Sequence, residues 1–212
     1  PQSGEALEAA CAALSGGVAG RPALQAVAST NAAAEEVVGA MRRFPGRAEL
    51  LTWACGALAG LCANHPANQA AIAACRGVDA IAAAMRRHPQ EALLQTMACG
   101  ALGNLAANNM NNQTAIAAAG GIDLALAALA GHAASATVLQ SAIGAIWCLV
   151  KKSQDNQRRV TRAGGTEMIV EALQRHPADA ALRAMASGAL RVLVPGLGDA
   201  MAATLGQPPP TS

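Results

Sequence analysis

Aromatic side chains are almost absent from this sequence: its 212 residues include Trp53, Trp147 and Phe44 but no tyrosine. Strands favour aromatic and β-branched residues, whereas the 53% of apolar residues here consists largely of alanine and leucine. Alanine is the strongest helix former and lets neighbouring helices approach closely. The composition therefore excludes a sheet-rich fold and predicts an all-α protein.

Charge is also sparse and nearly balanced, with 15 basic and 13 acidic residues and a net charge of +2. No global field therefore favours nucleic acid or a membrane surface as the partner. The apolar runs are broken by residues such as Asp123, His132 and Gln140 well before the 18 or more apolar residues of a membrane span. Glu5 and Glu8 interrupt the first apolar stretch, so we expect neither a signal peptide nor a membrane span.

Cysteine pairs of the disulfide or zinc type are missing as well. The six cysteines include no CxxC pair, and isolated cysteines of this kind act as small apolar side chains. This usage predicts an intracellular, reducing compartment: the cytoplasm, with a ciliary or organellar location as the alternative. The sequence also contains no GxSxG, HExxH, phosphate-binding loop or dinucleotide fingerprint, so we expect neither an enzyme nor a cofactor.

A 44-residue period organises the sequence. The pentapeptide ACGAL begins at Ala54 and again at Ala98, and it returns as AIGAI from Ala142 and ASGAL from Ala186. The motif MRRFP at Met41 likewise returns 44 residues later as MRRHP. Such a period with helical spacing inside it is typical of an α-solenoid, in which each unit buries its apolar face against its neighbours.

The period divides the chain into units. We predict a partial N-terminal repeat at 1–33, full repeats at 34–77, 78–121 and 122–165, a C-terminal capping repeat at 166–205, and a disordered tail at 206–212. In the first full repeat we expect helices over about 34–43 and 48–63, and a shorter one that Arg76 and Gly77 close with a left-handed glycine cap. A short helix is also expected over about 22–31, with Pro22 in its first turn.

Three histidines recur at the same step: His88, His132 and His176. Equivalent positions in stacked helices lie about 8–10 Å apart, whereas two ligands of one zinc ion each lie about 2 Å from it. We therefore expect no metal site. Each histidine is expected instead at the end of a helix, facing the negative end of the helix dipole.

The repeat resembles the armadillo repeat. The features in common are three helices per unit, a GG(I/V)D entry, a long helix ending in GALGNLAAN, and the segments NNQTAIAAAGG (111–121) and QDNQRRVTRAGG (154–165), which are similar to the first helix of that family. The resemblance implies a right-handed α-solenoid of armadillo-like three-helix repeats. It also implies that the long, ACGAL-bearing helices line a concave groove.

In nuclear-import adaptors of that family, a Trp and an Asn one turn later recur along the groove and hold extended basic peptides. Here the Trp position holds Gly56, Gly100, Gly144 and Gly188, and the Asn position holds Gly60, Asn104, Cys148 and Val192. Only Asn104 matches, which disfavours a receptor for nuclear-localisation signals. The glycine-bearing version is more similar to the divergent repeats of protist, algal and ciliary scaffolds.

Glycine in the middle of a helix costs roughly 1 kcal/mol relative to alanine, so its recurrence suggests a use. Either the long helices pack too closely for a Cβ, or the glycines form a smooth channel in which a partner helix or extended chain approaches the backbone. Three residues before each glycine lie Trp53, Met97, Ser141 and Met185. These would form an adaptable contact surface or belong to the ordinary core.

Lys151 and Lys152, with Arg191, are predicted to form a basic corner for an acidic partner. We expect a non-enzymatic protein-binding scaffold or adaptor that holds a partner segment along the groove. The alternative is an architectural subunit permanently embedded in a large multiprotein assembly, for example a ciliary or organellar one. Binding of nucleic acid through 151–162 is a third possibility, which the lack of aromatic side chains for base stacking weakens.

Overall fold

The computed structural model describes residues 3–18 and 31–195, and every regular element within them is a helix. The helices are α1 (Gly4–Val18), α3 (Asn31–Arg43), α4 (Ala48–Cys62), α5 (Pro66–Ala74), α6 (Gly77–Arg87), α7 (Ala92–Ala106), α8 (Met110–Ala118), α9 (Gly121–Gly131), α10 (Ala136–Val150), α11 (Gln154–Arg162), α12 (Gly165–Arg175) and α13 (Ala180–Leu193). The helix expected over 22–31 lies largely outside the described residues, and the expected tail at 206–212 lies wholly outside them.

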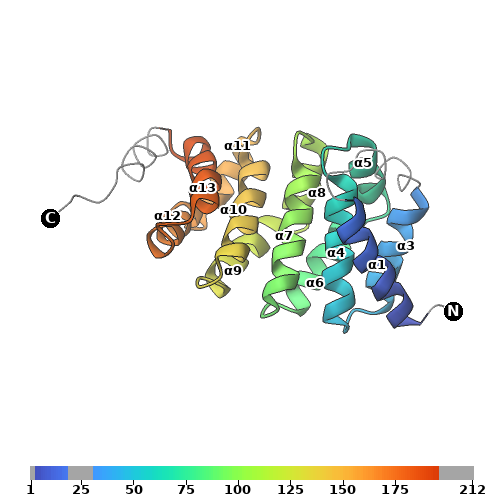
Figure 1. The fold of residues 1–212 in the computed structure, drawn as a ribbon. Coiled ribbons are helices and arrows are strands. Elements are labelled where there is room, and N and C mark those ends of the chain that lie inside the picture. The colour runs from blue at the N-terminus through green and yellow to red at the C-terminus, as the bar shows by residue number, and fades with distance from the viewer. Residues whose placement is uncertain (1–2, 19–30, 196–212) are drawn as a thin grey trace.

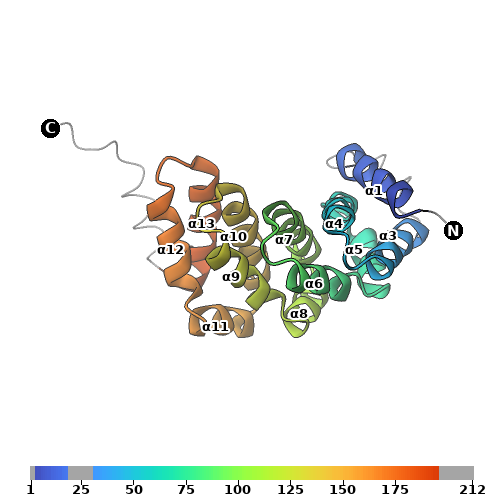
Figure 2. The same cartoon turned by 90° about the horizontal axis from the view of Figure 1, so that it is seen from below.

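The helices repeat as sets of three that stack into a solenoid. The long helices α4, α7, α10 and α13 lie side by side in one layer, with α1 against α4 (Figure 1). The middle helices α3, α6, α9 and α12 lie behind them, and the short helices α5, α8 and α11 follow the long ones (Figure 2). The predicted all-α solenoid of 44-residue, three-helix repeats is therefore confirmed.

The core is continuous along the stack because equivalent side chains of successive repeats pack together. Leu58, Leu102, Ile146 and Leu190 occupy one repeat position and are all fully buried. The alanines that open each ACGAL-type motif are also fully buried. At Gly103 a Cβ would lie 3.3 Å from the Cα of Ala145, so α7 and α10 pack closely where both residues are small.

Asparagine and glutamine side chains join the short helices to the long ones. Asn112 of α8 donates to the carbonyl of Leu105 at 3.0 Å, and Gln113 donates to the carbonyl of Cys148 in the next repeat at 3.0 Å. Gln69 of α5 likewise donates to the carbonyl of Asn104 at 2.8 Å. These bonds satisfy carbonyls near the ends of the long helices, which have no partner within the helix.

The three recurring histidines connect consecutive repeats. They are the C-cap residues of α6, α9 and α12. Their Nε2 atoms contact backbone carbonyls of the preceding repeat: His88 to Pro45 at 2.9 Å, His132 to Pro89 at 2.8 Å, and His176 to Ala133 at 3.0 Å. Because a carbonyl only accepts, each of these rings carries a proton on Nε2. The sequence placed the histidines at helix ends but did not predict this link between repeats.

The predicted glycine cap at Gly77 is wrong by one residue. The left-handed residue is Arg76, with φ of 61°, and the equivalent positions are Gly120 and Gly164, with φ of 81° and 76°. Gly77 is instead the first residue of α6, where a Cβ would lie 2.5 Å from Cγ2 of Ile72. Gly77 is therefore needed for close packing, while the backbone strain falls on Arg76.

Candidate partner-binding site

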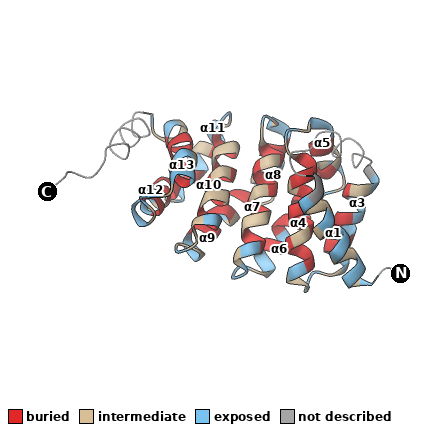
Figure 3. Cartoon of the chain, in the orientation of Figure 1, coloured by how far each residue is buried: buried red, intermediate tan, exposed pale blue. Residues whose placement is uncertain are grey.

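The residues predicted to contact a partner lie along the face of the long helices, where buried and exposed surface meet. Figure 3 shows half-buried positions along α7 and α10 on the side turned to the viewer. Trp53, Met97, Ser141 and Met185 are all half-buried there. They belong neither wholly to the core nor wholly to solvent, so their contact with a partner stays a prediction.

Two of the four glycines are open. Within the described part of the chain, no atom lies within 4 Å of a Cβ built at Gly100, and a Cβ at Gly144 would approach the sulfur of Met185 at 3.7 Å. At Gly56 and Gly144, a Cβ would contact the residue three positions before the next glycine, Met97 at 3.4 Å and Met185 at 3.7 Å. Met185 reaches toward Gly144 in this way, whereas the short Ser141 leaves the backbone of Gly100 uncovered.

The other two glycines are covered by side chains of neighbouring helices. A Cβ at Gly56 would lie 2.3 Å from Oγ of Ser15 in α1, and one at Gly188 would lie 2.8 Å from the indole of Trp147 in α10. The recurring glycine thus serves close packing at the two ends of the stack and leaves open backbone in the middle. Close packing, one of the two uses expected from the sequence, thus occurs at Gly56 and Gly188, whereas the approach of a partner to Gly100 and Gly144 stays a prediction.

A hollow of about 350 Å³ lies where α7, α10 and α13 meet. It is lined by Cys99, Gly100, Gly103, Asn104, Gln140, Ser141, Gly144, Ala145, Trp147, Cys148 and Met185. The structure thus brings five predicted residues together: Gly100, Asn104, Ser141, Gly144 and Met185. Trp53 lines a different hollow, between the starts of α4 and α7, and Gly56, Met97 and Gly188 line neither of the two.

Polar side chains at the edge of this hollow are held by their neighbours. Asn104 donates its amide to the carbonyl of Ala59 at 2.9 Å, and Gln140 donates to both carboxylate oxygens of Asp179, at 2.8 and 3.0 Å. The pKa of Asp179 is lowered, chiefly because its carboxylate accepts from the backbone N–H of Leu182, with Gln140 contributing. The polar side chains at the edge of the hollow are therefore held in place by hydrogen bonds within the protein.

The thiols of this region are protonated at neutral pH. Burial raises the pKa of Cys99 to about 12. Burial also raises the pKa of Cys148, and the nearby charge of Lys151 offsets part of that rise. All six cysteines of the chain are free thiols. Because the thiolate is the nucleophile, these cysteines act here as apolar and polarisable lining.

The basic corner adjoins the hollow through Trp147. The ammonium of Lys151 lies 5.9 Å from the centroid of the indole, within the range of a cation–π contact. Lys152 is exposed, and Arg191 on α13 donates from Nε to the carbonyl of Ser187 at 3.3 Å. Lys151 is also the C-cap residue of α10, where a cation suits the helix dipole.

The sequence analysis did not predict Gly103, Gln140 or Trp147 as residues that line the hollow. Gly103 and Trp147 each lie three residues after an open glycine, Gly100 and Gly144, and this spacing places them on the same helix face. That signal was present in the sequence. The role of Gln140 depends on Asp179, a partner 39 residues away, and no local pattern indicates it.

Residues 3–18 and 31–195 contain no group of three His, Cys, Asp or Glu side chains arranged to hold a metal ion. In the same part of the chain, no single helix has the length and apolar composition to cross a membrane. The pair α8 and α9 reaches both only jointly, with a bend of 69° between the two helices.

No protein-family model matches the sequence, and no curated protein matches it. Two crystal structures of engineered proteins from the Northeast Structural Genomics Consortium are similar in fold. One is 18% identical with a TM-score of 0.81, and the match covers 97% of this chain and 83% of the other. The second is 20% identical with a TM-score of 0.79, covering 97% of this chain and 81% of the other. At these identities the likeness shows the fold alone.

Proposed function

We propose that this chain is an armadillo-like, non-enzymatic scaffold or adaptor that holds a segment of a partner protein along its long helices. The hollow between α7, α10 and α13 supports this proposal most directly. It combines uncovered helix backbone at Gly100 with the partly buried, polarisable side chains of Trp147 and Met185. Such a surface suits a helix or extended chain that inserts an apolar side chain.

The charges beside the hollow favour a partner with acidic residues. Lys151 is exposed beside Trp147 and Lys152 is exposed after it, and the carboxylate of Asp179 at the edge of the hollow is already bonded to Gln140. Charged residues at the edge of an interface speed association and orient the partner. The six free thiols fit a reducing, intracellular setting, in the cytoplasm or in a cilium or organelle.

The experiment that tests this function places a photo-cross-linking amino acid at Ser141, in the hollow, in cells that produce the full chain. The control position is Ala127, an exposed residue of the middle helix α9. We expect one dominant cross-linked partner from position 141 and none from position 127. Mass spectrometry then identifies the partner and the segment that is held.

A pair of glycine substitutions sharpens the test. Gly100→Glu introduces a charged side chain into the hollow at a position where a Cβ would contact no neighbouring helix of the described chain within 4 Å. Gly39→Glu is the matched control, because position 39 of α3 is equally open to a Cβ and is exposed. We expect Gly100→Glu to abolish the cross-link from position 141 and Gly39→Glu to leave it unchanged. Both variants should keep the helical circular dichroism of the parent.

Other results would overturn the adaptor. Cross-links from both positions to several neighbours in fixed ratio, persisting in high salt, would favour an architectural subunit embedded in a large assembly. A cross-link from position 141 that survives Gly100→Glu would remove the hollow from the interface.

A further inference from the structure

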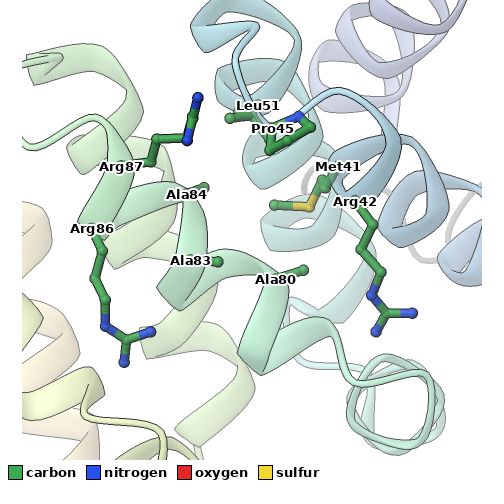
Figure 4. A pocket seen from close by; sticks show the side chains of 9 residues that line it. All are labelled: Met41, Arg42, Pro45, Leu51, Ala80, Ala83, Ala84, Arg86 and Arg87. Atoms are coloured by element: carbon green, nitrogen blue, oxygen red, sulfur yellow. The ribbon is translucent and has the colours of Figure 1, made fainter.

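A second hollow of about 550 Å³ lies between α3 and α6, in the layer of middle helices and away from the long-helix face. Figure 4 shows its apolar floor, with Met41, Pro45 and Leu51 on one side and Ala80, Ala83 and Ala84 of α6 on the other. Met41 and Leu51 are almost fully buried, so the floor of the hollow is part of the core.

Comparison of equivalent repeat positions explains why the hollow between α3 and α6 is open. Ala80 lies at the position that Leu124 occupies in α9 and Met168 occupies in α12. The corresponding hollow between α9 and α12, which Met168 lines, measures about 240 Å³. A small residue at position 80 thus leaves a space that larger side chains narrow elsewhere in the same architecture.

Two arginines rim the hollow, Arg42 from α3 and Arg87 from α6, while Arg86 also lines it but points its guanidinium away from the space between the two helices (Figure 4). Arg42 donates to the carbonyls of Cys75 and Arg76 at 2.7 and 3.3 Å, and Arg86 donates to the carbonyl of Ala119. These backbone bonds fix the two guanidinium groups without neutralising them. Arg87 has no hydrogen-bond or ion-pair partner among the described residues.

The charge is not balanced by a carboxylate. No acidic residue of the described chain lines this hollow, whereas the hollow between α9 and α12 is lined by Glu171 together with Arg175. Position 171 corresponds to Ala83. The step between α3 and α6 therefore differs from its counterpart in two ways: its apolar space is larger, and no carboxylate lines it among the described residues.

We propose that this hollow is a second protein-binding site, which takes an acidic segment of a partner protein with one apolar side chain. The apolar side chain enters between Met41 and the alanines of α6, and flanking carboxylates pair with the arginines. Arginine binds carboxylates through paired N–H donors, and fixing the donors beforehand lowers the entropic cost of binding. Because arginines lie on both helices, the ligand needs negative charges on both sides of its apolar group. An acidic peptide provides this arrangement.

The test uses the full chain and a fluorescein-labelled nine-residue peptide with one central leucine flanked by glutamates. Two control peptides replace the leucine by glycine or the glutamates by lysine. Fluorescence anisotropy should show that the leucine–glutamate peptide binds at least tenfold more tightly than either control. Its affinity should fall as salt rises, because the exposed charges are screened.

Matched variants locate the site. Ala83→Glu introduces the carboxylate that Glu171 supplies at the other step, and it should weaken binding at least tenfold. Ala127→Glu places the same residue at the same repeat position of α9 and should change nothing. Ala80→Leu fills the space with the side chain that the fold already accepts at Leu124, and it should also weaken binding at least tenfold.

The remaining outcomes decide against the proposal. Equal binding of all three peptides, or full affinity in both Ala83→Glu and Ala80→Leu, would overturn it. Binding of decanoate but not of the peptides would reassign the hollow to a small amphipathic carboxylate. Self-association in sedimentation that Ala83→Glu abolishes, without peptide binding, would reassign it to a second copy of the chain. Gly100→Glu should not affect peptide binding, which separates this site from the one on the long helices.

Discussion

The indole of Trp147 occupies the space that a side chain at position 188 would need: a Cβ there would lie 2.8 Å from the ring. Trp147 belongs to α10 and Gly188 to α13, so an apolar ring on one repeat rests on bare backbone of the next. The same ring lies under the ammonium of Lys151. The contact thus fixes one wall of the hollow and couples it to the basic corner.

Replacing glycine by alanine should therefore have opposite effects at two equivalent positions. Gly188→Ala forces Trp147 to move, and overpacking of this kind typically costs about 1–3 kcal/mol. Gly100→Ala meets no atom within 4 Å in the described chain and should stabilise by about 0.5–1 kcal/mol through helix propensity. Urea unfolding followed by circular dichroism measures both changes. A stabilising Gly188→Ala would show that the indole is not held against α13.

Substitution of His132 tests the link between repeats. His132→Phe keeps an aromatic ring at a position where the first repeat already has Phe44, but it removes the hydrogen bond to the carbonyl of Pro89. We expect a loss of about 0.5–1.5 kcal/mol in the free energy of unfolding. An unchanged value would mean that water replaces the imidazole at no cost.

The buried thiols predict a loss of stability in base. Burial raises the pKa values of Cys55, Cys62 and Cys99 to about 12 from an ordinary value of 9.0. Below pH 9 both folded and unfolded thiols are protonated, so their contribution is complete. Above pH 9 the unfolded chain ionises first, and stability is lost as pH rises toward 12, by about 1.4 kcal/mol per thiol and pH unit.

Unfolding curves at pH 8 and pH 10 measure this loss. Cys99→Ala removes one of four buried thiols, because Cys11 is also buried and its pKa is raised to about 11, and the variant should reduce the loss by about a quarter at most. An unchanged pH dependence in that variant would show that other groups cause the base sensitivity.

Alkylation should distinguish the half-buried thiol of the hollow from its fully buried neighbours. Iodoacetamide should modify Cys148 before Cys55 or Cys99, because Cys148 is more accessible and Lys151 offsets part of the rise in its pKa. Lys151→Glu should slow the modification of Cys148, since a nearby anion disfavours the thiolate. Lys152→Glu is the matched control with no expected effect. Peptide mapping by mass spectrometry gives the rates, and equal rates in the two variants would contradict the prediction.

The period and the helices could be predicted because both depend on residues that are close together in the sequence. The helix expected over 48–63 spans Ala48–Cys62, and that expected over 34–43 spans Asn31–Arg43. Apolar spacing, proline breaks and glycine ends are all properties of neighbours along the chain. The stacking of units then follows, because no unit can bury its apolar face alone.

The differences between repeats could not be predicted, because they depend on side chains from the adjoining repeat. The glycines look alike in sequence, yet Ser15 covers Gly56 and Trp147 covers Gly188 while Gly100 stays open. Asn104 matches the family's peptide clamp, but its amide is already bonded to the carbonyl of Ala59. A repeated motif fixes where a residue lies, and its non-repeated neighbours decide what it touches.

Because the histidine hydrogen bonds recur at every junction, the 44-residue unit could be duplicated within the chain. A chain in which residues 78–121 occur twice would carry a second copy of His88 to meet the first Pro89 carbonyl, and a second Pro89 carbonyl to meet His132. The hydrogen bonds of Gln69 and Gln113 would also form at each junction, because each glutamine donates to a carbonyl of the next repeat. The length of the solenoid could thus be changed by whole repeats, with the same hydrogen bonds at every interface between repeats.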